Sequence, residues 1–168
     1  MSANSWSLWR WYILAILVVA LDQGSKVWVA AAFDYAETLE VLPFFNMTLV
    51  YNRGAAFSFL SDAGGWQRWL FAVIGIVVSV IIAVWISRLS LQQKRLSLAL
   101  SLILGGAIGN LWDRAILGHV IDFIDIHYLG YHWPAFNLAD SAITLGALLL
   151  IVDSLFAGGE RKKEATHE

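Results

Sequence analysis

Four long apolar segments constrain the fold of this chain more than any other feature of its sequence. They cover residues 11–33, 69–86, 96–117 and 138–156. A helix needs about 20 mostly apolar residues to cross the hydrocarbon core of a bilayer. Of the 168 residues, 59% are hydrophobic and only 14% are charged. The sequence therefore predicts an all-α integral membrane protein, with residues 1–168 forming a single membrane domain of four transmembrane helices.

The first apolar segment also has some features of a secretory signal peptide. Arg10 precedes an apolar run, and a tract of small residues occupies positions 30–32. The apolar stretch resumes after Lys26, however, which makes it longer than the apolar region of a signal peptide. We therefore interpret this segment as a retained transmembrane helix.

The basic residues predict the orientation of the four segments. Lys and Arg precede the first segment, lie between the second and third, and follow the fourth, at Arg10, Arg88, Lys94, Arg95, Arg161, Lys162 and Lys163. The connections 34–67 and 118–137 contain acids and histidines but few Lys or Arg. Because cytoplasmic loops are enriched in Lys and Arg, both termini are predicted to be cytoplasmic and both connections to lie outside.

The first outer connection, residues 34–67, is too long to be a simple turn. Residues 41–52 are rich in β-branched and aromatic side chains, which predicts a small β element. The polar sequence Asn52-Arg53-Gly54 follows and is compatible with either a turn or a ligand site. Residues 58–66 are amphipathic, so we expect a short interfacial helix there.

Ionisable side chains concentrate around the third and fourth segments. Four acids fall between residues 105 and 140, namely Asp113, Asp122, Asp125 and Asp140. Charged groups beside lipid are costly and therefore suggest function. Two of them also have structural explanations: Asp113 can pair with Arg114, and Asn137 with Asp140 is typical of a capping box. The residues alone do not decide which two acids matter.

Two further patterns lie within the apolar segments. Asp22 and Lys26 are four residues apart, in the order that favours an ion pair on one helix face, which is compatible with either a self-neutralising pair in the bundle or a direct role in function. Gly105 and Gly109 form a GxxxG pair, which allows another helix to approach closely.

Several functional classes are excluded or disfavoured. The absence of Cys excludes disulfides, thiol catalysis and thiolate metal sites, and a net charge of −2 argues against nucleic-acid binding. His119, His127 and His132 are spaced by eight and five residues, which fits no common zinc motif. We therefore expect no metal, no cofactor and no nucleic-acid partner.

Five motifs in order resemble those of the bacterial lipoprotein signal peptidases (signal peptidase II). They are DQGSK at 22–26, NRGAAF at 52–57, GGAIGNLWDR at 105–114, VIDFID at 120–125 and FNLADSAI at 136–143. The resemblance covers essentially the whole chain. It implies an intramembrane aspartyl endopeptidase whose catalytic pair is Asp122 and Asp140. The surrounding residues implied to bind substrate or support this pair are Asp22, Lys26, Asn52, Arg53, Gly54, Asn110, Asp113, Arg114 and Asn137.

The resemblance also implies a substrate and a location. The substrate class is prolipoproteins, cut before a Cys that carries a diacylglyceryl group, in contact with membrane lipids. The enzyme is expected to be a multi-pass monomer of the bacterial inner membrane, with its active site near the periplasmic face.

Asp140 begins a helix, where the dipole favours its ionised form, so we expect Asp122 to carry the proton that the pair shares.

The alternative hypothesis is a proton-coupled membrane transporter that uses buried carboxylates as a relay. Such transporters tend to show internal repeats and broken helices near the bilayer midplane. This sequence shows no repeat, and its acids gather at one interface. A non-catalytic scaffold would leave Asn110, Asp113, Asp122 and Asp140 unexplained together.

Overall fold

Four helices form most of the computed structural model, which describes residues 3–54 and 64–164. They are α1 (Ala3–Ala32), α2 (Trp66–Ser87), α3 (Lys94–Ile116) and α4 (Leu138–Glu164). Each contains a stretch that is long and apolar enough to cross a membrane: Leu8–Ala32, Trp66–Ser87, Lys94–Ile116 and Leu138–Leu155. The four predicted segments are thus confirmed as helices long and apolar enough to span a membrane, although α2 begins at Trp66 rather than at residue 69.

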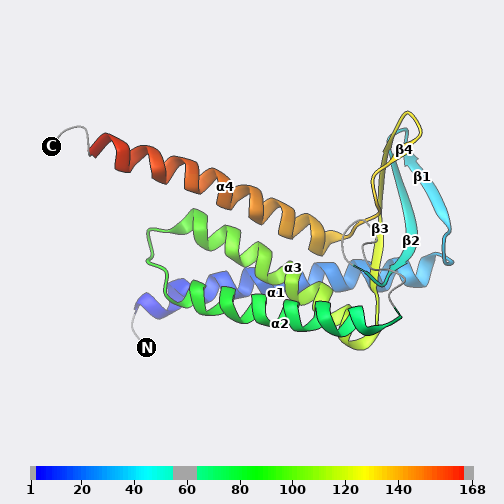
Figure 1. Ribbon diagram of the computed structural model, residues 1–168, viewed down its shortest axis with the longest axis horizontal. Helices are drawn as coiled ribbons and strands as arrows, with labels where there is room; N and C mark the ends of the chain where they lie inside the picture. The colour runs from blue at the N-terminus through cyan, green and yellow to red at the C-terminus, as the bar shows by residue number, and fades with distance from the viewer. Residues whose placement is uncertain (1–2, 55–63, 165–168) are drawn as a thin grey trace.

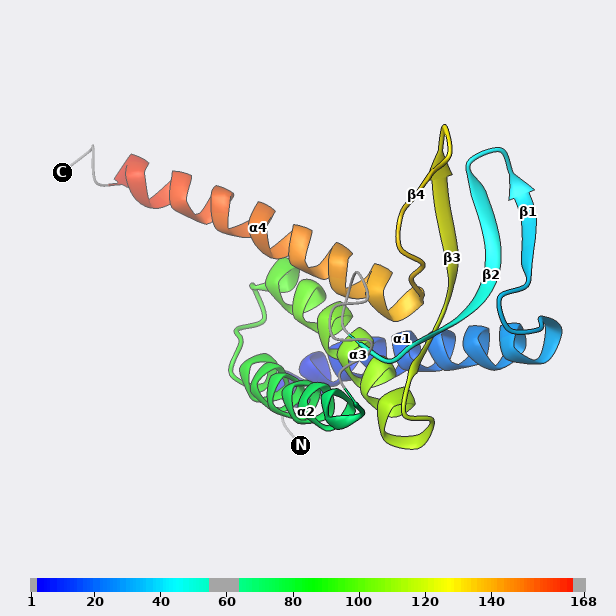
Figure 2. The same cartoon turned by 45° about the vertical axis from the view of Figure 1, so that its right-hand side comes forward.

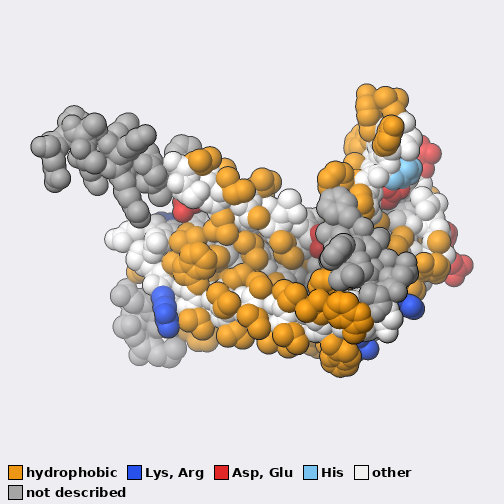
Figure 3. Space-filling model, viewed as in Figure 1, with side chains coloured by type: hydrophobic (Ala, Val, Ile, Leu, Met, Phe, Trp, Pro, Cys, Tyr) orange, Lys and Arg blue, Asp and Glu red, His pale blue; other side chains and the backbone are white. Residues whose placement is uncertain are grey.

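Helix α3 is the central helix of the bundle. Of its apolar window, 56% is buried, compared with 11–22% for the other three helices. Large apolar side chains instead cover the outside, as Figure 3 shows along the helices. Such a surface is stable in lipid, where apolar side chains need no protein partner.

Small residues let α1 and α4 approach α3 at close range. A Cβ at Gly105 would lie 2.6 Å from Val18 Cβ of α1, and one at Gly106 would lie 2.7 Å from Ile143 Cγ1 of α4. A Cβ at Gly109 would meet Asp22 Oδ2 at 2.6 Å. The predicted packing role of the GxxxG pair is confirmed.

A four-stranded antiparallel sheet covers one end of the bundle. Its strands are β1 (Thr38–Leu42), β2 (Phe45–Asn52), β3 (Val120–Tyr128) and β4 (Tyr131–His132), in the order β1-β2-β3-β4. Figures 1 and 2 show the sheet standing across the ends of the helices, whereas the start of α1 and the end of α4 lie at the opposite end.

The sheet corrects the prediction of an all-α protein with one small β element in the first connection. That element exists as β1 and β2, but β3 and β4 come from the second connection. The first four residues of β3 are all buried, so they lack the alternation of polar and apolar residues that reveals a half-buried strand. Periodicity cannot distinguish such a short apolar run from a helix.

The predicted interfacial helix at residues 58–66 falls mostly outside the described residues. Of its three described residues, 64 and 65 form a turn and Trp66 is the first residue of α2.

Two apolar clusters flank a polar layer inside the protein. One cluster lies within the bundle and includes Ala15, Ile86 and Leu100. The other packs α1 against the sheet and includes Val29, Leu49 and Phe123. Buried polar side chains from α1, α3 and β3 lie in the layer between them, and this layer contains the candidate site.

Candidate active site

Asp122 is held in the middle of the sheet by two amides. It lies on β3, where its Cα is paired with that of Val50 on β2, and Asn52 is paired with Val120. Asn52 is therefore the diagonal neighbour of Asp122 on the same face. Asn52 Nδ2 donates a hydrogen bond to Asp122 Oδ2 at 3.0 Å, and Asn137 Nδ2 donates to Asp122 Oδ1 at 2.7 Å.

Asp140 lies in the first turn of α4 and takes part in the predicted capping box. The Asp140 N–H donates to Asn137 Oδ1 at 2.9 Å, and the Asn137 N–H donates to Asp140 Oδ2 at 3.3 Å. The other carboxylate oxygen, Oδ1, accepts a hydrogen bond from Asn110 Nδ2 at 2.7 Å. Capping therefore explains only one of the two carboxylate oxygens.

The segment before α4 brings Asp140 back to β3. Phe136 forms a bridge with Ile124, with the Phe136 N–H donating to Ile124 O at 3.1 Å and Phe136 O accepting from the Ile124 N–H at 2.8 Å. Asn137 follows directly and contacts both Asp122 and Asp140. The two acids that the motifs selected are thus joined through one side chain.

A buried cluster of three charges lies beside the two acids. Lys26 Nζ is 2.7 Å from Asp22 Oδ2 and 2.9 Å from Asp113 Oδ2. The exposed fractions are 1% for Lys26, 0% for Asp22 and 1% for Asp113. The predicted pair of Asp22 and Lys26 is confirmed, whereas the ion pair of Asp113 is with Lys26 rather than with Arg114.

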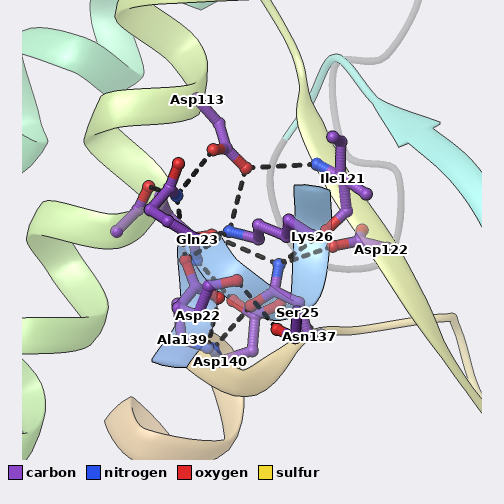
Figure 4. Close-up of polar contacts among 12 residues, drawn as sticks. Asp22, Gln23, Ser25, Lys26, Asp113, Ile121, Asp122, Asn137, Ala139 and Asp140 are labelled. Atoms are coloured by element: carbon purple, nitrogen blue, oxygen red, sulfur yellow. Dashed lines mark hydrogen bonds and ion pairs between the residues drawn. The ribbon is translucent and has the colours of Figure 1, made fainter. Parts of the chain in front are cut away.

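This charge cluster fixes the backbone next to each of the two acids (Figure 4). Asp22 Oδ1 accepts a hydrogen bond from the Ala139 N–H at 2.9 Å, one residue before Asp140. Asp113 Oδ2 accepts from the Ile121 N–H at 3.3 Å, one residue before Asp122. Because a carboxylate bonds strongly to backbone N–H groups, α1 and α3 set the relative position of β3 and α4.

Lys26 also determines how the amide of Asn110 is oriented. Lys26 Nζ donates to Asn110 Oδ1 at 3.0 Å, so the Nδ2 group of Asn110 is directed to Asp140. An ammonium group can only donate hydrogen bonds, which makes this orientation unambiguous. Asn110 therefore always offers a donor to Asp140.

Arg114 and the residues after β2 border the same site. Arg114 Nη2 donates to Gly54 O at 3.1 Å, and the Gly54 N–H donates to Asn52 Oδ1 at 2.9 Å. The guanidinium also interacts electrostatically with Asp140, Asp122 and Asp113. Arg53 is exposed and lies at a neighbouring cavity instead.

The surroundings of Asp122 change its acidity. Burial, followed by the negative charge of Asp140, raises the pKa of Asp122 from 3.8 to about 7, against the opposing effect of the hydrogen bonds from Asn52 and Asn137. Asp122 is 2% exposed, whereas Asp140 is half-buried. One acid is therefore poised to hold a proton near neutral pH, and the other is more accessible to water.

Asp125 belongs to a separate group at the far end of the sheet. It accepts a hydrogen bond from Asn46 Nδ2 at 2.8 Å, and His132 Nδ1 lies 2.9 Å from its carboxylate. His127 stacks on His132 with ring centroids 4.9 Å apart. Within residues 3–54 and 64–164, no group of three or more His, Cys, Asp or Glu is arranged to hold a metal ion.

Gln23 is the residue of the site that sequence reasoning missed. Its Nε2 group donates to Asp22 Oδ2 at 3.1 Å and to Asp113 Oδ1 at 2.8 Å, which joins α1 to α3. Its position beside Asp22 in the DQGSK motif was the available signal. The backbone N–H groups of Ile121 and Ala139 carry no sequence signal at all.

Comparison with known proteins places the chain among membrane proteases. A sequence profile described as Signal peptidase (SPase) II matches residues 14–156. The lipoprotein signal peptidase of Cellvibrio japonicus is 61% identical over 145 residues, which are 86% of this chain and 85% of that protein. That of Shewanella baltica strain OS155 is 55% identical over 149 residues, with 89% and 87% covered.

A solved structure agrees with this placement. A bacterial membrane enzyme superposes with a TM-score of 0.81 at 33% identity, over 90% of each chain. The chain belongs to the lipoprotein signal peptidase family, signal peptidase II. It is thus a multi-pass membrane protease of the family that removes signal peptides from prolipoproteins.

Proposed function

We propose that this protein is an intramembrane aspartyl endopeptidase and that Asp122 and Asp140 are its catalytic pair. The observation that carries the proposal is that Asn137 contacts both carboxyl groups. Its side-chain amide donates to Asp122 Oδ1, and its backbone N–H donates to Asp140 Oδ2. Two nearby carboxyl groups cannot both ionise easily, so they share one proton and titrate as a unit.

The environments of the two acids assign their roles. Asp122 keeps the shared proton because its pKa is raised to about 7. Asp140 is the base, since it is half-buried and sits at the start of a helix, where the dipole favours a negative charge. Pairs of acids whose environments differ in this way divide acid and base functions between them.

The reaction then needs only water and the two acids. Asp140 accepts a proton from a water molecule as its oxygen attacks the scissile carbonyl carbon, while Asp122 donates its proton to the carbonyl oxygen. The resulting tetrahedral intermediate collapses when its C–N bond breaks. A proton moves from Asp140 to the leaving nitrogen, and one hydroxyl of the intermediate returns a proton to Asp122 as the new carboxyl group forms. Asn52, Asn110 and Asn137 hold the carboxyl groups in place during these steps.

The proposed substrate is a prolipoprotein whose Cys carries a diacylglyceryl group, cut just before that Cys. The site lies where the helices meet the sheet, so water and a lipid-embedded chain can reach the same bond. We place this end at the periplasmic face of the inner membrane and both termini in the cytoplasm. The reason is that most Lys and Arg residues, at positions 10, 88, 94, 95 and 161–163, lie at the other end. We propose a single domain acting as a monomer without a metal or cofactor.

Asparagine variants of three acids test the assignment. Asn is nearly isosteric with Asp and still caps a helix, but it neither activates water nor carries the proton. Asp122→Asn and Asp140→Asn should each abolish cleavage of a lipidated prolipoprotein by the purified enzyme. The double variant should be no worse than either single variant, because residues that act as a unit are not additive.

Asp125→Asn is the matched control on the same strand as Asp122. Its partners are Asn46 and His132, so cleavage should stay close to the wild-type rate. Thermal stability and binding of a non-cleavable substrate show whether each variant is folded. If Asp140→Asn cleaves at a rate near wild type, Asp140 is only a capping residue and the proposed pair is wrong.

A further inference from the structure

A second polar feature lies at the sheet end of the bundle, separate from the two acids. It is a cavity of about 330 Å³ between the start of α2 and the turn that connects α3 to β3. Among the residues lining it are Arg53, Gln67, Arg68, Trp69, Gly118 and His119. Neither Asp122 nor Asp140 lines the cavity, so its chemistry is distinct from that of the candidate active site.

The cavity is positively charged. Two of its lining residues are arginines, and the described lining residues include no Asp or Glu. His119 contributes little charge, because burial first, and then the nearby Arg53, lower its pKa. The charge of the cavity therefore comes from the two guanidinium groups, and an anion is the ligand that matches them.

Arg68 is held in a fixed orientation toward this cavity. Its Nε donates to Arg114 O at 2.7 Å and its Nη2 to Ala115 O at 2.6 Å, both in the last turn of α3. Both acceptors are neutral carbonyls, so the guanidinium keeps its positive charge. Its Nη1 lies beside Gly118, where an added Cβ would come within 3.1 Å, and the φ of +82° there favours glycine.

The surroundings place the cavity at the level of lipid headgroups. Trp69 lines the cavity, and the exposed Trp66 and Trp112 lie in the adjoining end regions of the apolar spans of α2 and α3. Tryptophan is enriched where a membrane protein crosses the boundary between lipid and water. Figure 3 shows basic side chains beside hydrophobic ones at this end of α2.

We propose that this cavity binds the phosphodiester group of an anionic membrane phospholipid, with Arg53 and Arg68 as its cationic ligands. Arginine suits this group because its planar donors match two phosphate oxygens at once. The acyl chains would lie along the apolar surface of α2 and α3. A choline headgroup is disfavoured, since its cation would approach two arginines without a carboxylate to balance it.

Binding measurements on the purified full-length protein in a maltoside detergent test this proposal. The probes are a short-chain phosphatidylglycerol, a phosphatidylcholine with the same acyl chains, and inorganic phosphate, each titrated by calorimetry. Phosphatidylglycerol should bind at least about tenfold more tightly than phosphatidylcholine or inorganic phosphate. Arg53→Gln should weaken the binding of phosphatidylglycerol about tenfold, which is the effect of losing one charged hydrogen bond.

Two variants complete the test. Arg88→Gln removes the same charge from an exposed position at the other end of α2 and should leave lipid binding unchanged. Arg68→Gln should weaken binding as Arg53→Gln does, and Arg68→Lys should weaken it less. Arg68 also donates hydrogen bonds to α3, so the binding results of its variants are interpreted only if their melting temperature matches that of the wild type. If it does not, the comparison of Arg53→Gln with the wild type tests the proposal.

Three results would overturn the proposal. Equal affinity for the two lipids would show that the cavity does not select an anionic headgroup. Equally tight binding of inorganic phosphate would mean a site for soluble anions, with no part for lipid. Identical affinities of Arg53→Gln and Arg88→Gln would place lipid binding elsewhere on the protein.

Discussion

Replacing Lys26 by Met should destabilise the protein more than any other single change to the buried charge cluster. Met fills a similar volume but leaves Asp22 and Asp113 without their shared cation. At the observed separations of 2.7 and 2.9 Å, each pair has a gross attraction of about 6 kcal/mol at an effective dielectric constant of about 20. Desolvation of the charges offsets much of this attraction.

The net effect is smaller but still large. Removing one partner of a buried ion pair costs about 3–5 kcal/mol, because the remaining charge stays buried without compensation. We expect the free energy of unfolding of Lys26→Met to fall by that amount. Cleavage should fall as well, since the carboxylates that hold the Ile121 and Ala139 N–H groups would move.

The assay is reversible unfolding in mixed micelles of maltoside and dodecyl sulfate, followed by circular dichroism, together with cleavage of a lipidated prolipoprotein. Lys94→Met, an exposed lysine at the start of α3, is the control and should change stability by less than about 1 kcal/mol. The double variant Lys26→Met with Asp22→Asn should recover part of the loss, because it removes one uncompensated charge. If Lys26→Met costs no more than Lys94→Met, the cluster is solvated and our account of the site is wrong.

Four more predictions follow from the site, the packing and the basic residues. The rate of cleavage should fall as the pH rises through about 7, where Asp122 loses its proton, and a flat profile up to pH 9 would contradict its role as the acid. The pKa of Asp122 is about 7 in the folded protein and about 3.8 in the unfolded chain. Between pH 4 and 7 only the unfolded chain ionises this group, so the free energy of unfolding of the wild type should fall by up to about 4 kcal/mol across that range. Unfolding experiments on Asp122→Asn should not show this fall. Gly106→Ala should destabilise the protein by about 1–3 kcal/mol through overpacking against α4, whereas Gly24→Ala, where no described atom lies within 4 Å of the added Cβ, should not; equal melting temperatures would refute this. A reporter fused after Glu168 should be active in the cytoplasm, and activity only in the periplasm would reverse the proposed orientation.

The helices of this protein follow directly from its sequence, because length and apolar composition are sufficient to define a membrane span. The strand β3 does not. Its first residues are buried on both faces, so Val120-Ile121-Asp122-Phe123 shows no alternation. The basic residues correctly predict that connection 118–137 lies at the same end as connection 34–67, but only the structure shows that its strand β3 pairs with β2.

The sequence allowed most residues of the polar cluster to be selected, with Gln23 missed and Arg53 found at another cavity, but it did not reveal how they contact one another. Local spacing correctly predicted the Asp22–Lys26 pair and the capping box of Asn137 with Asp140, since both involve neighbours on one helix. Asp122 was chosen through the resemblance alone, because nothing local distinguishes it from Asp125. The link from Asp22 to the Ala139 N–H spans 117 residues, and no pattern in a single sequence reports such a contact.

The distribution of the site over the chain has a consequence for biosynthesis. α1 provides the lysine, β2 an amide, α3 a second amide and a carboxylate, β3 one acid and α4 the other. A nascent chain that has inserted only three helices therefore lacks Asp140 and the Ala139 N–H that positions it. The proposed peptidase is latent until its last helix enters the membrane, so incomplete chains pose no proteolytic hazard to the membrane in which they are made.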